Sequence, residues 1–553
     1  MYHNFKSTCK AKSLDTSKAE ASMDAERIQR LRWATLAVLS VSLIMLNLDN
    51  TILNVALPTL VRDLHSTTSQ LQWIADSYTL VFAGLLLTGG SLGDRLGRKW
   101  IFMAGLFVFG LGSVLSAFSG SSDTLIVTRG FMGIGGAMAM PATLSIITNV
   151  FTVPKERAKA IAIWSGASGL GIALGPITGG WLLSHFWWGS VFLVNAPIVA
   201  AGILAAIWIV PNSKDVNIPK PDPVGSLLSI VALGTILWSI IEAPSKGWSS
   251  APIVTGFVVG GFLLAVFLVW ESKISHPMLR LHFFENPRFS MAASSIAIAF
   301  FVLGGASFLL TQYLQFVRGY SPLKAGALFL PLAGALLVLS PLSANVAHKF
   351  GTKVTVAFGL SVIGISAFMI SLFTTSTSLL SVELTMGLVG VGLAFTMPPS
   401  AESVMGSLPR AQAGVGSATN GTLIQVGGAL GVAILGSLLA TSYSTHLSAL
   451  RFFSMVPAQL RPVLKSSVGS ALIAARSLPS SVGSQIASGG KGAFVSALSS
   501  SLLVAVGVAV LGAVLVLLIL PARARGESEG QAKATDPSSI RLNDELSVAE
   551  REL

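Results

Sequence analysis

The chain has 553 residues, of which 52% are hydrophobic and only 11% are charged. Soluble proteins carry about 25% charged residues, so this composition excludes a soluble globular protein and indicates a chain that lies mostly within a bilayer. The net charge of +12 does not indicate nucleic acid here, because most Lys and Arg residues fall in tails and alternate loops. Cys9 is the only cysteine, which excludes an internal disulfide framework and a cysteine metal site, and no metal is expected.

A membrane-spanning helix needs about 20 mainly apolar residues, and the chain contains about 14 such runs. We predict spans at 33–57, 71–92, 100–119, 124–148, 159–183, 188–210, 225–243, 252–270, 289–314, 323–345, 353–374, 379–401, 413–441 and 494–520. Residues 1–32 are polar and lack the pattern of a cleaved signal peptide, so they are predicted to be an N-terminal tail. Residues 521–553 are charged and are predicted to be a disordered tail.

An even number of spans places both termini on one side of the membrane. Basic residues cluster in the tails and in the loops on that same side, which predicts that both termini are cytoplasmic in a bacterial inner membrane or plasma membrane. The external segment 442–493 disagrees, because it contains five Lys and Arg residues and no acid, but long loops cross largely regardless of charge. We expect a folded hairpin there, with an interfacial amphipathic helix over 446–464 as the alternative.

Two pairs of short segments repeat along the chain. GIGGAMAMP at 133–141 is similar to GVGLAFTMP at 390–398, and LGRK at 96–99 is similar to FGTK at 350–353. A repeat of this length predicts a six-helix half at 33–210, two inserted helices within 211–287 and a second six-helix half at 288–520. Parallel halves of this kind bind a substrate near the membrane midplane and rock about it.

The segment GSLGDRLGRK places four charges between two uncharged spans. Charge alone would predict only a cytoplasmic loop with a turn. The order of residues resembles the signature of the major facilitator superfamily between its second and third helices, through Gly90, Asp94, Arg95, Gly97, Arg98 and Lys99. The resemblance implies that Asp94, with Arg95 and Arg98, holds the halves together in the outward-open state by contact with the start of the span after Arg410.

Further segments resemble the 14-helix drug:proton antiporters of the EmrB/QacA type, within the QacA-like branch. They are LDNTILNVALP at 48–58, WIADSYTL at 73–80, SGLGIALGPITGG at 168–180, HFWWGSVFLVNAPI at 185–198 and TQYLQFVRGYSPLKAG at 311–326. In the third of these, the spacing of small residues predicts a smooth helix side for close packing, with a bend at the proline. The resemblance implies that this antiporter motif seals the path against proton leak, through Gly171, Gly175, Pro176, Gly179 and Gly180.

Ionisable side chains inside a span cost about 2.5 to 3.5 kcal/mol on insertion scales, so each is a functional hypothesis. Asp49 and Asp76 are predicted in the outer half of the first two spans. Water-poor surroundings favour the neutral form of a carboxyl, which can then take up a proton outside and release it to the cytoplasm. A lipophilic cation could compete for the same carboxylate. The alternative is internal hydrogen bonding to neighbours such as Asn50, Thr51 or Asn54.

Arg129, with Gly133 and Ala137 following at helical spacing, looks like the RxxxG motif of the fourth helix, where the resemblance implies an arginine that influences the proton site. The alternative is an arginine that extends to the membrane interface. Glu271, near the end of an inserted span, is expected at the interface. Further candidates for contacts in the central path are Asn54, Tyr78, Gln312, Tyr313 and Glu383, although Gln312 could equally form a bond between helices.

These features together predict an all-α integral membrane protein with the major facilitator fold and 14 spans. The expected function is a proton-driven multidrug efflux transporter for lipophilic, cationic compounds, working by alternating access as a monomer without a cofactor. A narrow exporter of an antibiotic or metabolite is the alternative, and an uptake symporter is a further one. An enzyme or an ATP-driven pump is not expected, because HExxH and P-loop motifs are absent and SGGKG at 488–492 has the wrong spacing.

Overall fold

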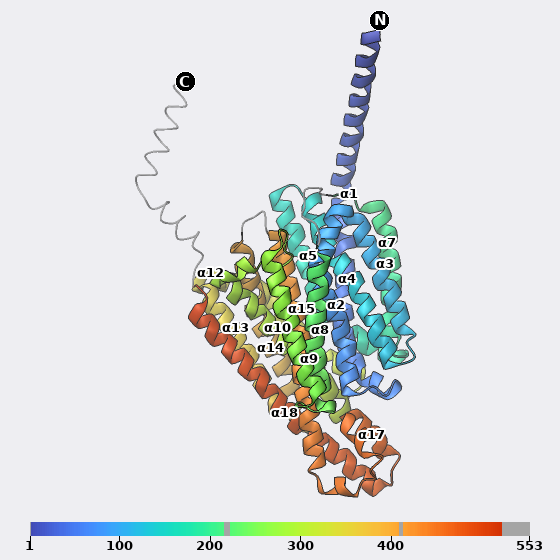
Figure 1. Cartoon of the computed structure of the whole chain (residues 1–553), viewed down its shortest axis with the longest axis vertical. Coiled ribbons are helices and arrows are strands. Elements are labelled where there is room, and N and C mark those ends of the chain that lie inside the picture. Colours follow the sequence, from blue (N-terminus) through green and yellow to red (C-terminus); the bar gives the residue numbers. More distant parts are fainter. Residues whose placement is uncertain (1, 215–221, 409–412, 522–553) are drawn as a thin grey trace, which may run out of the picture.

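The computed structural model describes residues 2–214, 222–408 and 413–521. These residues are almost entirely helical and contain no strand (Figure 1). Fourteen helices within them are long and apolar enough to cross a membrane, which confirms the number of spans predicted from the sequence. Except for Pro521, the predicted C-terminal tail lies outside the described residues.

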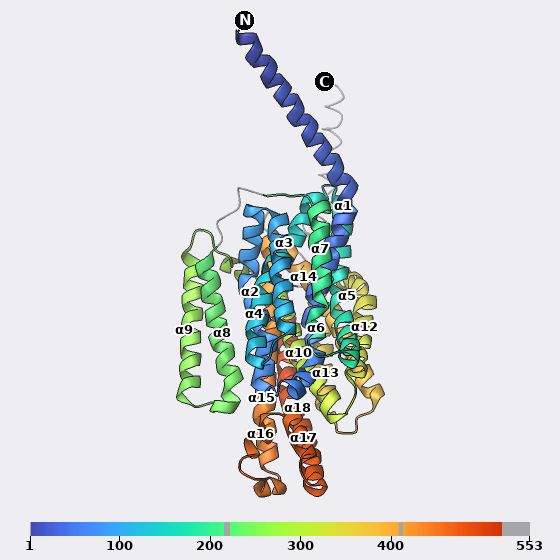
Figure 2. The ribbon, with the colours of Figure 1, turned by 90° about the vertical axis from the view of Figure 1, so that its right-hand side faces the viewer.

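The first half of the molecule is one bundle of antiparallel helices. It comprises α1 (Tyr2–Asp63), α2 (Thr68–Leu96), α3 (Arg98–Ala117), α4 (Ser122–Val150), α5 (Pro154–His185) and the sixth span, which is divided into α6 (Ser190–Leu193) and α7 (Asn195–Ile209). Residues 2–32, predicted as a separate tail, instead continue α1 as a helix that projects from the bundle (Figures 1 and 2). Ala, Lys, Glu and Arg are frequent there and favour helix over irregular structure.

Two inserted helices, α8 (Pro223–Lys246) and α9 (Ala251–Lys273), precede the second half. That half contains α10 (Pro287–Gln312), the π-helical turn η2 (Tyr313–Val317), α11 (Pro322–Ala327), α12 (Leu330–Phe350), α13 (Thr352–Ser371), α14 (Leu379–Gly406), α15 (Ala413–Ser448) and α18 (Ser480–Ile519). A short 3₁₀ helix, η1 (Leu281–Glu285), lies between α9 and α10.

Close helix crossings repeat between the two halves. A Cβ atom at Gly135 of α4 would lie 2.6 Å from the carbonyl oxygen of Gly105 in α3, and one at Gly392 of α14 would lie 2.9 Å from that of Gly359 in α13. Gly171 of α5 packs against the Ile44 carbonyl of α1 in the same way that Gly427 of α15 packs against the Ala297 carbonyl of α10. Offsets of 253 to 257 residues therefore relate the helices of the two halves.

The inserted helices form a hairpin beside the two halves (Figure 2). Helix α8 contacts α2 of the first half and α15 of the second half through one apolar cluster, formed by Leu80, Leu237, Ile240, Ile241, Ala429 and Ala433. Glu271 is in the last turn of α9, near the end of this span, and its exposed fraction is only 2%. Through α8, the inserted hairpin contacts both halves of the molecule.

The segment 442–493 is helical and projects beyond the bundle (Figures 1 and 2). Helices α15 and α18 extend into it and enclose η4 (Arg451–Met455), α16 (Arg461–Ser466) and α17 (Val468–Arg476). The alternative of one interfacial helix over 446–464 is wrong, because three separate helical pieces divide that stretch. We call residues 449–479 the cap, the end of the bundle beneath it the cap end, and the opposite end, which carries residues 90–99, the motif end.

Candidate functional site

A buried ion pair lies in the core of the first half. Asp49 of α1 and Arg129 of α4 both have an exposed fraction of 0%, and Arg129 Nη1 donates a hydrogen bond to Asp49 Oδ2. Arg129 Nε also donates to the Ile74 carbonyl of α2 at 3.3 Å. The alternative of an arginine that extends to the membrane interface is therefore wrong, and the pair joins three helices.

A second donor reaches the same carboxylate from the sixth span. Asn195, at the start of α7, donates from Nδ2 to Asp49 Oδ1 at 2.9 Å and to Ser113 Oγ of α3 at 3.0 Å. Ser113 Oγ in turn donates to the Phe192 carbonyl at 2.7 Å. Sequence reasoning did not identify Asn195 or Ser113; the signal was an amide between apolar residues in VFLVNAPI. The partners of Asp49 come from other helices, so the alternative of bonds to Asn50, Thr51 or Asn54 is wrong.

Aromatic rings enclose the Arg129 side chain. Its guanidinium carbon lies 4.6 Å from the centre of the Tyr78 ring and 5.8 Å from that of Phe192. Tyr78 itself is completely buried and its ring stacks on Phe82. Cation–π contacts stabilise a buried guanidinium, so Tyr78 belongs to this site. Its hydroxyl oxygen has no hydrogen-bond partner among the described residues.

The Asp49 carboxylate is the counter-charge of Arg129, whose other neighbours include a carbonyl and aromatic rings. Breaking a buried pair costs several kcal/mol because it leaves one charge uncompensated. Among the described residues, Arg129 Nη2 and Asn195 Oδ1 are buried without partners, so the cluster retains a spare donor and a spare acceptor.

Asp76 lies on a different face of α2 from Tyr78 and is not part of this cluster. One turn before it, Gln72 donates to the carbonyls of Val432 and Ala433 in α15, at 3.0 and 2.9 Å. One turn after it, Leu80 also packs on α15. Asp76 is 1% exposed, and its Oδ2 has no partner among the described residues. This carboxyl is therefore buried in the seam between α2 and α15, where the two halves meet.

Several contacts hold the halves together at the cap end, and three of them lie within the spans. Gln72 joins α2 to α15, and Gln315 of η2 donates to the Val55 carbonyl of α1 at 2.9 Å. Helix α5 meets α11 so closely that a Cβ at Gly180 would lie 2.7 Å from the Pro322 carbonyl oxygen. Gln312, the other predicted polar contact in this region, instead bonds within its own helix to the Phe308 carbonyl.

The predicted antiporter motif packs on two helices. Gly171, Gly175 and Gly179 lie against α1, where a Cβ at Gly179 would be 2.6 Å from Ile52 Cγ1. Pro176 and Gly180 instead face α11 of the second half. Toward the motif end of the same helix, Gly166 and Gly169 have open space beside them. The smooth side predicted from the sequence is thus used for close packing in the part of α5 nearer the cap end.

At the motif end, residues 90–99 form the turn between α2 and α3. Gly97 ends one helix and begins the next with φ +117°, a conformation that favours glycine. Arg98 Nε donates to Asp94 Oδ1 at 2.5 Å, and Lys99 Nζ donates to the Ile207 carbonyl of α7 at 2.8 Å. Gly351 has the equivalent role between α12 and α13, with φ +89°.

The contacts of Gly90 and Asp94 in the predicted latch remain within the first half. Asp94 is paired with Arg98 of its own motif, Gly90 lies against Pro141 of α4, and Arg95 is half-buried. The implied partner of Asp94, the start of the span after Arg410, falls partly outside the described residues. Among the described residues, the polar contacts between the halves that are named above, those of Gln72 and Gln315, therefore lie at the cap end.

Other predicted contact residues have mixed positions. Tyr313 is buried and its hydroxyl donates to the Thr374 carbonyl at 2.6 Å, so it fastens η2 to the α13–α14 connection. Asn54 of α1 and Glu383 of α14 are half-buried. None of these three side chains joins the cluster around Asp49.

The sequence matches the family model of the Major Facilitator Superfamily over residues 39–432. The chain belongs to this superfamily. A relative is the multidrug efflux pump LfrA of Mycolicibacterium smegmatis, 33% identical over 490 residues that cover 88% of this chain and 96% of LfrA. The methyl viologen resistance protein SmvA of Salmonella typhimurium is 33% identical over 465 residues, covering 84% and 93%. The tetracenomycin C resistance and export protein of Streptomyces glaucescens is 33% identical over 429 residues, covering 77% and 79%.

Solved structures confirm the major facilitator fold. A bacterial homologue of the human lysosomal transporter Spinster aligns with a TM-score of 0.61 at 19% identity, covering 89% of this chain and 99% of that one. The peptide transporter POT aligns with a TM-score of 0.58 at 16% identity, covering 88% and 94%. The protein is thus a multi-pass membrane protein of a transporter superfamily.

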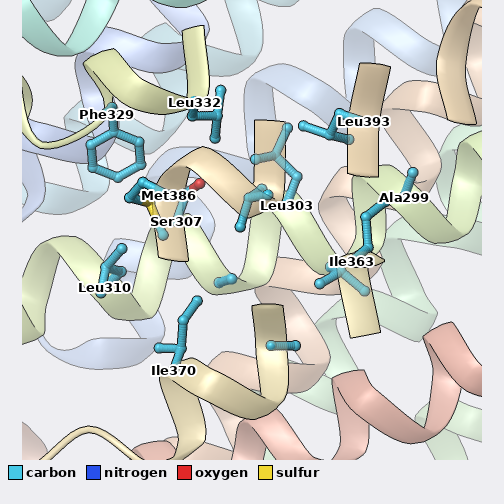
Figure 3. A pocket seen from close by; sticks show the side chains of 14 residues that line it. Ala299, Leu303, Ser307, Leu310, Phe329, Leu332, Ile363, Ile370, Met386 and Leu393 are labelled. Carbon is cyan, nitrogen blue, oxygen red and sulfur yellow. The ribbon is translucent and has the colours of Figure 1, made fainter. Parts of the chain in front are cut away.

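Among the described residues, the buried ion pair of the first half has no counterpart in the second half. In the second half, an apolar cavity of about 20 Å³ lies between α10, α12, α13 and α14 (Figure 3). Four residues that line it are the repeat equivalents of the first-half cluster: Val302 for Asp49, Leu332 for Tyr78, Ala367 for Ser113 and Met386 for Arg129. The two halves therefore share a backbone arrangement but differ in the chemistry of their cores.

Proposed function

We propose that this protein is a proton-driven multidrug efflux transporter, a drug:proton antiporter that exports lipophilic, cationic compounds by alternating access. The superfamily membership and relatives named for multidrug efflux and methyl viologen resistance support export of such compounds. The observation that carries the proton part is the buried cluster of Asp49, Arg129 and Asn195. The transporter would work as a monomer in the cell membrane, with both termini in the cytoplasm, and without a cofactor.

Protonation of Asp49 would act through Arg129. The loss of the carboxylate charge releases a guanidinium that also holds the Ile74 carbonyl of α2, while Asn195 links the same carboxyl to α7. One proton therefore changes the contacts between four helices of the first half. Because Asp49 is sealed inside this half, the drug does not compete for it directly, in contrast to the simplest antiport scheme suggested by the sequence.

Asp76 would be the carboxyl that responds to the opening of the cap end. It lies in the seam that Gln72 fastens, so separation of α2 from α15 would expose it to the outside. There it would bind a proton, or a cationic drug for which it provides a counter-charge. The state described here, with the halves held at the cap end, would correspond to a cytoplasm-facing stage of the cycle.

A narrow exporter of one antibiotic is the second candidate. It is favoured by the relative from Streptomyces glaucescens, which is named for tetracenomycin C resistance and export. The two candidates share the proton chemistry and differ only in the breadth of substrates.

Efflux of ethidium from energised cells tests the proposal, with Asp49→Asn and Asp76→Asn compared at matched membrane levels. Asp63→Asn is the control, because Asp63 is an exposed acid on the same helix as Asp49. We expect protonophore-sensitive efflux by the wild type and the control, and none by Asp49→Asn. In proteoliposomes, Asp49→Asn should still exchange drug for drug without a proton gradient, because only coupling is lost.

Absence of ethidium efflux by a well-inserted wild type, combined with resistance to a single antibiotic, would favour the narrow exporter. Wild-type levels of proton-coupled efflux in Asp49→Asn would refute the assignment of the proton to this cluster.

A further inference from the structure

A second pair of buried acids lies in the inserted hairpin, far along the chain from Asp49 and Asp76. Asp222 precedes the first turn of α8, and Glu271 is in the last turn of α9, so both are at the motif end. Their exposed fractions are 4% and 2%. Apart from Asp49 and Asp76, they are the acids that are fully buried among the described residues, and the proposed transport mechanism does not use them.

The two carboxyl groups converge over Gly225. Asp222 Oδ1 accepts from the backbone N–H of Gly225 at 2.9 Å, and Asp222 Oδ2 accepts from Trp270 Nε1 at 2.9 Å. A Cβ atom at Gly225 would lie 2.6 Å from Glu271 Oε1 and would also touch Asp222 Oδ2. These two oxygens are therefore within about 5 Å of each other, close enough for strong repulsion if both groups are charged.

Hydrogen bonding differs between the two groups. Asp222 has two donors and lies at the N-terminus of α8, where the helix dipole stabilises an anion. Glu271 Oε2 accepts from the backbone N–H of Leu279 at 2.9 Å. Glu271 Oε1 is buried, faces Asp222 and has no partner among the described residues. A buried oxygen that has no hydrogen-bond partner and faces a carboxylate is a position at which a proton can bind.

Basic groups on neighbouring elements do not neutralise the pair. On α2, α9 and the connection to α10, which adjoin the pair, the charged and titratable residues at this end are Asp94, Arg95, Lys273, His276, Arg280, His282 and Glu285. Where the chain is described, none of the basic groups approaches Asp222 or Glu271 within 4.0 Å. Two buried carboxylates at this separation cannot both remain ionised without a counter-charge.

We propose that Asp222 and Glu271 form a proton-binding site within the inserted hairpin, in which Glu271 binds the proton and Asp222 stays ionised. The site is separate from the Asp49 cluster and does not depend on drug transport. It also lies near the turn at residues 90–99: Ser226, in the first turn of α8, bonds to the Asp222 carbonyl at 3.0 Å and to Thr88 of α2, two residues before Gly90. Loss of the proton would place two like charges at the point where the hairpin meets α2.

Dicyclohexylcarbodiimide, which modifies protonated carboxyls in apolar surroundings, tests the site in the full-length protein in lipid nanodiscs. Mass spectrometry of the digested protein should find an adduct on Glu271 at about pH 6 that decreases toward about pH 9. Asp222→Asn retains the helix cap but removes the like charge, so labelling of Glu271 at neutral pH should fall by about threefold or more. Glu242, a partly exposed acid paired with Lys246 in the same hairpin, is the control and should label weakly.

Thermal unfolding of each variant separates loss of labelling from loss of folding. Absence of a Glu271 adduct at every pH in a folded wild type would overturn the proposal. So would unchanged labelling in a folded Asp222→Asn variant. Protection of Glu271 by sodium at constant pH, relative to choline, would also overturn it, because a metal cation and not a proton would then occupy the pair.

Discussion

Replacing the buried ion pair by its second-half equivalents gives a sharp test of what the pair contributes. Arg129→Met alone leaves Asp49 buried with only Asn195 as a donor, and such an uncompensated charge should lower the free energy of unfolding by about 3 to 5 kcal/mol. The double variant Asp49→Val with Arg129→Met reproduces Val302 and Met386 of the other half. We expect the free energy of unfolding of this double variant to be within about 2 kcal/mol of the wild-type value, because apolar replacement of a whole buried pair is often neutral or stabilising.

Denaturant titration in mixed micelles gives these free energies, and proton-coupled efflux measured in parallel should be lost in both variants. Arg62→Met is the matched control, since Arg62 is exposed at the end of α1 and its guanidinium carbon lies 5.6 Å from the centre of the Phe316 ring. This variant should lower the free energy of unfolding by less than about 1 kcal/mol. The single variant Asp49→Val completes the cycle. Additive costs, with the double variant losing as much stability as Arg129→Met and Asp49→Val together, would refute the view that the pair is one energetic unit.

Three other substitutions test the packing around the site. Gly175→Ala places a Cβ against Thr51 and 2.9 Å from the Leu48 carbonyl oxygen, so it should abolish efflux and lower the melting temperature. The control is Gly166→Ala on the same helix, where the added Cβ has open space, and it should change neither efflux nor melting temperature. Gly97→Ala should cost about 1 to 2 kcal/mol of stability because φ is +117°, and equal stability to an exposed Gly120→Ala control would contradict this. Gln72→Leu removes three hydrogen bonds between α2 and α15, so spin labels on these helices should report more of the state open at the cap end. An unchanged distribution of distances between the labels would contradict the view that Gln72 holds the two halves together there.

The sequence by itself determined the class of protein, the number of spans and the repeat. An apolar run of about 20 residues can span a bilayer stably only as a helix, so its length and composition were sufficient to predict each span. The motifs at 90–99 and 168–180 also indicated where glycines permit a turn or a close crossing, because these demands are local to the backbone.

Tertiary structure alone decided which polar groups meet. Asp49 was predicted as a proton-binding carboxyl without a named partner on another helix, and Arg129 and Asn195 reach it from positions 80 and 146 residues away. Asp76 and Tyr78 are two residues apart, yet one faces the other half and the other lies beneath Arg129. Glu271 lies near the end of its span, and the fold of the α9–α10 connection buries it near Asp222. Such partnerships depend on how helices rotate and pack, and no local pattern in the sequence specifies that rotation.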